Sequence, residues 1–298
     1  MNGSRQMARR CRAGTWPAIV LGAIALVSSL RVFAGSASPD ELVVVHRGTI
    51  PIILTAPHGG RVDIPGVPLR NAPDAAHAAA FSKWGGFHAG GDPNTDVLTL
   101  RIAADIEKLT GHSPYVVLAK FDRRFVDANR PAELAYAGPA AAPYYALYHG
   151  TIRKFVDEIR RAHPAGLLLD VHGENKDTDV LMRGTSNGDT VSRLVQRAGA
   201  GSITGPDGLF GQLETQGFKV FPSNRLPLGH GSEDAGFSGG YTVNAYGSQK
   251  ANGIDAVQLE FGSRYRRDDE LDRTAARAAR AIVTFYKAYV ERAPRERR

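Results

Sequence analysis

The sequence predicts a single α/β domain built on a mostly parallel mixed sheet with helices on both faces. The first observation behind this prediction is that apolar, strand-like runs alternate with helical patterns along residues 35–298. Such alternation is typical of a largely parallel sheet that is covered on both sides. The second is that no internal repeat or low-complexity linker divides this stretch. We therefore expect one domain over residues 35–298.

The order of the elements follows from hydrophobic periodicity. The predicted strands, in chain order, are 41–45, 49–56, 115–118, 167–171, 179–182, 218–221 and 256–261. The predicted helices are 96–109, 144–162, about 190–198 and 269–291. For the first helix, Thr95 is the expected N-cap, and Gly111 is the expected stop.

Two loops and three strand ends indicate where a site should lie. The segments 59–94 and 223–240 carry no firm periodicity, and loops longer than about 15 residues in a compact domain are usually functional or disordered. His58, His172 and Glu260 all fall at or near the ends of predicted strands. Sites in open α/β sheets lie beyond the carboxyl ends of the strands. We expect these three side chains to meet there.

The first 34 residues have the layout of a secretory signal. They contain five arginines and no acid, with an apolar run from Trp16 to Leu30 and small residues at 32–34. The run is shorter than the roughly 20 residues of a comfortable membrane span. We expect cleavage and export to the periplasm or beyond, with an uncleaved anchor as the alternative. Cleavage would leave no membrane contact.

Charge and cysteine content exclude several classes of function. Beyond residue 34 the chain carries 32 basic and 30 acidic residues, a formal charge of +2. A formal charge this close to zero does not indicate the broadly basic surface that binds nucleic acid. The only cysteine, Cys11, lies in the segment that would be removed. A cysteine nucleophile, a disulfide framework and a thiolate metal site are therefore excluded in the mature chain.

Two histidines are candidate metal ligands. In the stretch LLLDVHGEN, Asp170 and His172 project from the same face of a strand, so His172 could bind a metal that Asp170 supports from behind. A buried Asp–His hydrogen-bonded pair is the alternative. With His58 and a carboxylate, the set has the pattern of a hydrolytic zinc site with one open position. Other divalent metals also suit histidine and carboxylate ligands.

Two further segments carry polar chemistry. The stretch RRFVDANRP places three arginines within eight residues, which suits a substrate carboxylate because a guanidinium binds carboxylate through two parallel bonds. A basic surface loop is the alternative. Glu260 lies in an apolar strand, where a carboxylate is costly unless it is paired. It is a candidate general acid or base, or one half of a buried salt bridge.

The order of these motifs resembles that of the N-formylglutamate amidohydrolase family, which is related to zinc carboxypeptidases and aspartoacylase-type deacylases. The resemblance covers about residues 50–265 and rests on PHGG, Thr95-Asp96, R-x-V-D-x-N-R, D-x-H-G, GGYT and QLE. It implies a zinc-carboxypeptidase-like fold and zinc on His58 and His172. It also implies that Asn129 and Arg130 hold the substrate carboxylate, that Arg124 polarises the scissile carbonyl, and that Glu260 moves the proton. Tyr241, in the GGYT stretch, is a further candidate substrate-binding residue.

The sequence departs from the related pattern at the third ligand. The carboxypeptidase pattern H-x-x-E would place an acid at position 61, which is Arg61. The resemblance implies Asp96 instead, with Asp63 and Glu174 as rivals and His230 as a further candidate. Breakdown of formylglutamate is cytoplasmic, whereas this chain is expected to be exported. The expected substrate is therefore a carboxylate-bearing small molecule or peptide, such as an N-acyl amino acid or a γ-glutamyl compound.

Two alternatives belong to other classes. A serine hydrolase would use Ser186 in the sequence GTSNG, with Asp207 and His230 downstream in the order usual for that class. It leaves His58, His172 and Glu260 unexplained. A non-catalytic exported protein that binds acidic amino acid derivatives is the other alternative, and Arg61 in place of an acid favours it.

Overall fold

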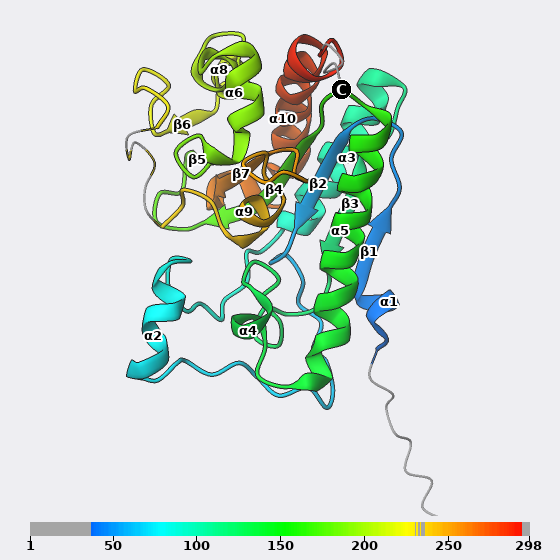
Figure 1. The fold of residues 1–298 in the computed structure, drawn as a ribbon, viewed down its shortest axis with the longest axis vertical. Coiled ribbons are helices and arrows are strands. Elements are labelled where there is room, and N and C mark those ends of the chain that lie inside the picture. Colours follow the sequence, from blue (N-terminus) through cyan, green and yellow to red (C-terminus); the bar gives the residue numbers. More distant parts are fainter. Residues whose placement is uncertain (1–36, 230, 232, 234–235, 294–298) are drawn as a thin grey trace, which may run out of the picture. The chain divides into compact units, whose positions relative to one another are not determined.

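One mixed sheet of seven strands organises the part of the chain that the computed structural model describes, residues 37–229, 231, 233 and 236–293. Its order is β1 (Val43–His46), β3 (Tyr115–Ala119), β2 (Ile52–Ala56), β4 (Leu167–Glu174), β7 (Asp255–Gly262), β5 (Val180–Gly184) and β6 (Lys219–Phe221). The four strands β3, β2, β4 and β7 are parallel neighbours. β1 is antiparallel to β3, β5 is antiparallel to β7, and β6 is parallel to β5. The predicted fold class, a mostly parallel mixed sheet, is confirmed (Figure 1).

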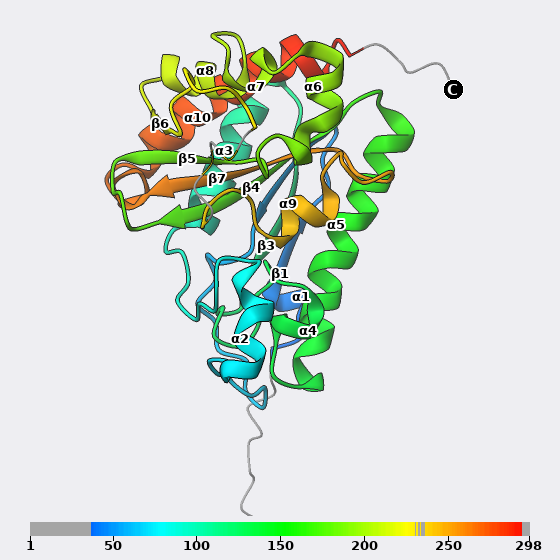
Figure 2. The ribbon, with the colours of Figure 1, turned by 60° about the vertical axis from the view of Figure 1, so that its left-hand side comes forward.

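Helices cover both faces of this sheet (Figures 1 and 2). The α-helices of the described residues are α1 (Pro39–Leu42), α2 (Ala75–Ser82), α3 (Thr95–Thr110), α4 (Ala132–Ala135), α5 (Ala142–Ala162), α6 (Ser192–Ala198), α7 (Gly201–Thr204), α8 (Leu209–Thr215), α9 (Tyr241–Tyr246) and α10 (Leu271–Phe285). None of the helices described is long and apolar enough to cross a membrane.

Two apolar cores lie on the two sides of the sheet. Leu54 and Leu169 belong to the core formed with α3, α8 and α10. Ile53 and Leu168 belong to the core formed with α5. Neighbouring residues of β2 and β4 thus enter opposite cores, because side chains alternate along a strand. Both cores need apolar residues, which explains why β2 and β4 each begin with three consecutive apolar residues.

The first predicted strand begins later than expected. Residues 39–42 form α1, because Glu41 accepts hydrogen bonds from the backbone N (2.7 Å) and the hydroxyl (2.9 Å) of Ser38. This reciprocal cap favours a helical turn over a strand.

The boundaries of two other predicted helices also differ from expectation. α3 begins at Thr95 itself, and its N-cap is Asn94, with φ of +68°. Thr95 instead donates its hydroxyl to the carbonyl of Asp92 (2.8 Å). Gly111 ends α3 in the left-handed region, as predicted. α10 ends at Phe285 and continues as a π-helical turn over Tyr286–Val290.

Candidate metal centre

His58, His172 and Glu260 meet at the carboxyl ends of neighbouring strands, as predicted. His58 lies two residues beyond β2, His172 lies in β4 and Glu260 lies in β7. His172 and Glu260 are register partners across the β4–β7 pair. All three are buried and line one cavity of about 430 Å³. Lys83, Trp84 and Gly85, directly after α2, also line this cavity.

Asp92 is the third residue of the cluster. Its Oδ2 atom lies 3.2 Å from His58 Nδ1 and 3.1 Å from His172 Nδ1. One ligand atom from each of the three residues lies within 4.8 Å of the other two. The same Oδ2 accepts the backbone N–H of Gly173 (3.2 Å). Asp92 follows a Gly-Gly pair and precedes Pro93, so no periodic pattern singled it out. A carboxylate in the long loop just before a helix was the only sequence signal.

The predicted third ligand, Asp96, lies outside this cluster. Asp96 is the second residue of α3 and is partly exposed, and its carboxylate lies beside the backbone of Gly59. The loop before α3 turns back instead, since the backbone N–H of Asp92 donates to His58 O (2.9 Å). This bond places residue 92 beside the first histidine and leaves residue 96 in the helix.

The other candidates for a third ligand have different positions. Asp63 is exposed and pairs with Arg124. Glu174 is buried and lines the cavity, where its carboxylate accepts the backbone N–H of Asp177. His230 lies outside the described residues.

Each histidine is oriented from behind by a second carboxylate. His58 Nε2 lies 2.7 Å from Asp127 Oδ1, and His172 Nε2 lies 2.9 Å from Asp170 Oδ2. Asp170 also accepts the hydroxyl of Thr55 (2.5 Å). A carboxylate that accepts one ring N–H fixes the tautomer and leaves the other nitrogen for a metal. Both histidines therefore use Nε2 for the supporting carboxylate and turn Nδ1 toward the Asp92 carboxylate.

The electrostatics of the cluster favour a positive charge between the histidines. Burial alone would lower the pKa of His172, but Asp170 and Glu260 outweigh burial and raise it well above its ordinary value. Burial would likewise raise the pKa of Asp92, whereas the two histidines hold it well below its ordinary range. A bound metal ion would take the place of the protons on these nitrogens. The donor set of two imidazoles and one carboxylate fits zinc or a related divalent ion.

Glu260 stands beside this cluster as a titratable group. It is buried, and its Oε1 accepts the side-chain N–H of Gln258 (2.7 Å). Burial raises its pKa to about 7, although the charge of His172 opposes the shift. A carboxyl group with a pKa near neutrality can both accept and return a proton. This is the chemistry predicted for Glu260.

The arginine-rich segment divides between the interior and the surface. Arg123 is buried and lines the cavity, donating Nε to Asp127 Oδ2 (2.9 Å). Arg124 has a half-exposed side chain (50 %) that pairs with Asp63 and Asp122. The structure therefore does not bring Arg124 into the cavity, and its role at the scissile carbonyl stays a prediction. Successive residues of this turn face opposite ways, and Arg123 is the one that reaches the cavity.

Asn129 and Arg130 line the cavity, as expected of substrate-binding residues. The side-chain oxygen of Asn129 accepts the N–H of Thr242 (2.8 Å), and its amide nitrogen lies 3.2 Å from His172 Nε2. Arg130 donates to the carbonyls of Asn129 and Gly86, while its buried Nε has no hydrogen-bond partner among the residues that the structure describes. That orphaned N–H is available to an acceptor.

Tyr241 lies behind the cavity lining. Its ring packs edge-on against Trp84 (5.5 Å between centroids) and His149 (5.4 Å), and Trp84 lines the cavity. Tyr241 thus supports the wall. Gly240, just before it, has no room for a side chain, because a Cβ there would collide with the amide of Asn129.

Ser186, the nucleophile of the alternative hydrolase, lies away from the metal cluster. Its hydroxyl lies 3.0 Å from the Asn244 side-chain nitrogen, and its φ of +48° is unusual for a serine. Ser186 is not among the residues that line the cavity. The histidine required by that alternative, His230, lies outside the described residues.

Replacing Arg123 should destabilise the fold, and replacing Arg124 should not. Arg123→Gln leaves the fully buried Asp127 without its nearest guanidinium, and losing one partner of a buried pair costs about 3 kcal/mol. Arg124→Gln removes pairs in which the arginine itself is half-exposed, so a change of less than about 1 kcal/mol is expected. Urea unfolding of both variants measures the difference. Equal stability of the two variants would contradict the assignment of these side chains.

Folding stability should fall in acid through His149. Burial lowers the pKa of His149 to about 4, and its Nε2–H donates to Ala128 O (2.9 Å), next to Asn129. Because the folded pKa lies below the unfolded value near 6.5, the contribution is complete above pH 6.5 and is lost as the pH falls toward 4. Between pH 7.5 and 4.5 we expect a loss of about 2 kcal/mol from this group. Urea unfolding at both pH values should show a smaller loss in His149→Gln; an unchanged loss would rule His149 out as its source.

Two solved structures share this fold. The N-formylglutamate amidohydrolase from Ralstonia eutropha JMP134 superposes with a TM-score of 0.55 at 15% identity, covering 85% of this chain and 99% of its own. The gene product Atu2144 from Agrobacterium tumefaciens gives 0.52 at 13% identity, covering 84% of this chain and 96% of its own. No protein-family model and no curated protein matches the chain. The structural likeness confirms the fold that the motif resemblance implied.

Proposed function

We propose that this protein is an exported metal-dependent amidohydrolase that cleaves a C–N amide bond in a carboxylate-bearing substrate. The observation that carries the proposal is the convergence of His58, Asp92 and His172 on one point, with Glu260 in the same cavity. Two oriented imidazoles and one carboxylate beside a titratable acid form the set that metal-assisted hydrolysis requires. The shared fold with an N-formylglutamate amidohydrolase supports the same class.

His58, Asp92 and His172 would hold the metal, with zinc as the first candidate. Such an ion supplies a Lewis acid and lowers the pKa of bound water to about 7. Asp127 and Asp170 keep the two rings oriented. Glu260, with its pKa near neutrality, accepts a proton from the attacking water and returns it to the leaving amine.

The lining of the cavity favours an acidic substrate. Lys83, Arg123, Arg130 and Lys176 line it against the carboxylates Asp92, Glu174 and Glu260, and a bound divalent ion would add to the positive side. Arg130 offers its orphaned Nε–H, and Asn129 lies beside it, so this pair is the proposed carboxylate anchor. A cavity of about 430 Å³ lies within the usual range for small-molecule sites. N-acyl amino acids, formylglutamate-like compounds and γ-glutamyl peptides fit these requirements. The secretory layout of residues 1–34 supports a site of action outside the cytoplasm.

The test combines elemental analysis of the purified chain with a panel of N-acyl amino acids and γ-glutamyl peptides. We expect about one divalent ion per chain and release of a free amine from an acidic member of the panel. Chelation should stop the release. Tight binding of an acidic derivative by a metal-free protein would instead favour the non-catalytic binding protein. Turnover that survives chelation and disappears in Ser186→Ala would favour the serine hydrolase.

A further inference from the structure

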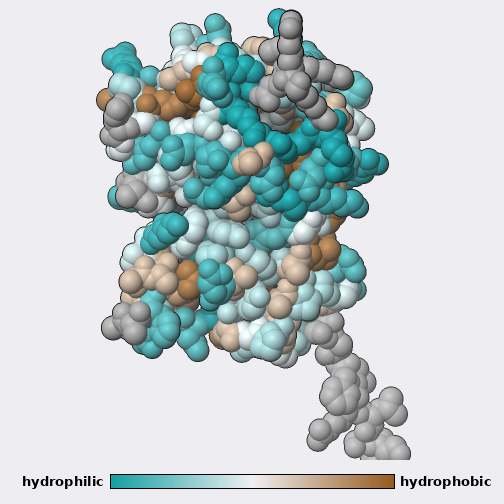
Figure 3. All heavy atoms as spheres, in the orientation of Figure 1, coloured by the Kyte–Doolittle hydropathy of each residue, from teal (hydrophilic) through white to brown (hydrophobic). Residues whose placement is uncertain are grey.

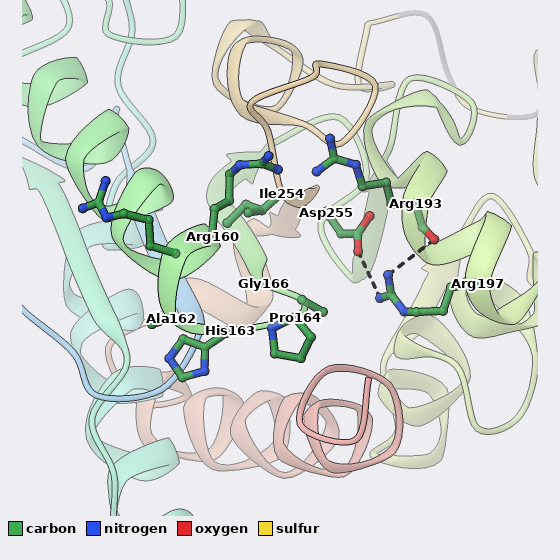
Figure 4. A pocket seen from close by; sticks show the side chains of 11 residues that line it. Arg160, Ala162, His163, Pro164, Gly166, Arg193, Arg197, Ile254 and Asp255 are labelled. Atoms are coloured by element: carbon green, nitrogen blue, oxygen red, sulfur yellow. Dashed lines mark hydrogen bonds and ion pairs between the residues drawn. The ribbon is translucent and has the colours of Figure 1, made fainter. Parts of the chain in front are cut away.

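Strand β7 carries two buried carboxylates that have different partners. Asp255, at its amino end, lines a second cavity of about 340 Å³ and pairs with Arg197 (3.3 Å), as Figure 4 shows. Glu260, near its carboxyl end, accepts the side-chain amide of Gln258 (2.7 Å). A neutral amide does not compensate the charge of a carboxylate as a guanidinium does. The contact between Gln258 and Glu260 therefore has a role other than charge compensation.

Gln258 is a buried amide in the wall of the cavity that holds the metal cluster. Its exposed fraction is 3%. Glutamine is usually an exposed residue, as Gln249 is just after α9, and the surface around α9 is predominantly hydrophilic (Figure 3). A buried amide costs free energy unless its donor and its acceptor are both paired. Gln258 meets this condition, because its oxygen accepts the backbone N–H of Gly240 (2.6 Å) and its nitrogen donates to Glu260.

The backbone of Gly240 determines which way the Gln258 amide points. A backbone N–H can only donate, so the atom that faces Gly240 must be the amide oxygen. The amide nitrogen then faces Glu260, to which it can only donate. Gly240 is itself confined, since a Cβ there would collide with the amide of Asn129. Glu260 Oε1 is therefore held as an acceptor, which leaves Oε2 to exchange a proton.

The neighbouring strand has the same arrangement. In β4, Asp170 orients His172, which lies two residues later in the strand (2.9 Å). In β7, Gln258 holds Glu260, also two residues later. Residues two apart project from the same face of a strand, and the register pairs Asp170 with Gln258 and His172 with Glu260. One row of side chains thus carries the reactive groups, and the row before it orients them.

We propose that Gln258 is a positioning residue for the hydrolysis, which holds Glu260 by Oε1 and so makes Oε2 the atom that takes up and returns the proton. This inference rests on the proposed function. Without the amide, the carboxylate is free to turn about its last side-chain bond, which has broad torsional preferences. A displacement of about 1 Å can cost about 10²-fold in rate. Gln258 belongs to neither the metal cluster nor the proposed carboxylate anchor, so metal content and KM should change little.

The test is a double-mutant cycle of the metal-loaded protein with Gln258→Met and Glu260→Met. Methionine is close to glutamine in length and cannot donate an N–H. With N-formylglutamate, N-acetylglutamate and γ-glutamylalanine as substrates, Gln258→Met should lower kcat at least about tenfold and leave KM within about twofold. In the Glu260→Met background, it should lower the residual kcat by less than about twofold, because no carboxylate remains to be positioned. Equal losses of kcat in both backgrounds would overturn the proposal.

A second variant separates the donor from the acceptor of the amide. In Gln258→Glu, the new carboxylate keeps the size of the side chain and can accept the N–H of Gly240, but it has no N–H for Glu260. Its kcat should also fall at least about tenfold, and an unchanged kcat would overturn the proposal. Gln249→Met is the matched control, since Gln249 donates to the carbonyl of Asn244 (3.0 Å) and does not line the cavity. Its kcat should stay within about twofold of the unmodified protein.

Urea unfolding of the same four proteins gives a readout that does not depend on turnover. Gln258→Met should lower the urea midpoint, and the drop in the Glu260→Met background should be at most about half as large, because the hydrogen bond to Glu260 is already missing. Equal drops in both backgrounds would overturn the proposal. If the unmodified protein cleaves none of the three substrates, the proposed function is wrong for them, and the urea cycle still decides whether Gln258 holds Glu260.

Discussion

Replacing Glu260 with glutamine is expected to leave the metal bound and to lower kcat/KM by about 10³-fold, within the usual range for a general acid or base. Glutamine keeps the shape of the side chain but cannot take up a proton. Glu260 lines the cavity without belonging to the His58–Asp92–His172 cluster, so metal content should not change. Steady-state kinetics combined with elemental analysis of the variant measure both parts.

The pH dependence of kcat/KM tests the role of Glu260 in a second way. As a base Glu260 must be ionised, so kcat/KM should fall as the pH drops below its pKa of about 7, and a bound cation would move this fall to lower pH. Glu174→Gln is the matched control, since Glu174 is a buried carboxylate of the same cavity that bonds to the backbone of Asp177. In Glu174→Gln, kcat/KM should still fall at low pH. In Glu260→Gln, this fall should be absent. Full turnover in Glu260→Gln would remove this residue from the mechanism.

Replacing His58 with alanine is expected to abolish both metal binding and turnover. His58 contributes one of the two imidazoles that face Asp92, and two remaining ligands form a poor site for a divalent ion. A milder change behind the other histidine should give a graded result. Asp170→Asn keeps the size of the side chain that orients His172 but should weaken metal affinity by about 10- to 100-fold.

Competition with a fluorescent chelator measures both affinities. Arg124→Gln is the control, because Arg124 lies on the surface outside the cavity. It should bind metal like the unmodified protein. If His58→Ala retained metal with unchanged affinity, the His58 imidazole would have to be a structural partner of Asp127 rather than a ligand.

Hydrophobic periodicity predicted the centre of the fold. The parallel strands β2, β3, β4 and β7 are rich in apolar residues because both of their faces are buried. The short helices are harder to predict. α2 and α9 lie in or directly after the two long loops, and their positions depend on contacts such as that between Tyr241 and Trp84. The reversal of β5 against β7 has no local signature, because strand direction depends on the path of the chain between them.

The candidate site was predictable where strands position its residues. His172 and Glu260 are register partners, and periodicity alone places both at one edge of the sheet. Asp92 and Arg123 lie in irregular segments. There, the direction in which a side chain points depends on the individual turn and follows no repeating pattern. The bond from Asp92 N to His58 O joins residues 34 apart, which no local pattern indicates. The resemblance pointed to Asp96 and Arg124, which lie close in the chain to Asp92 and Arg123, the residues that line the cavity.

The most direct test of the metal centre compares Asp92 with Asp96. The metal content of the unmodified protein, Asp92→Ala and Asp96→Ala is measured by elemental analysis after the same purification. We expect about one divalent ion per chain in the unmodified protein and in Asp96→Ala, and less than about a tenth of that in Asp92→Ala. Full metal content in Asp92→Ala together with its loss in Asp96→Ala would contradict the His58–Asp92–His172 centre.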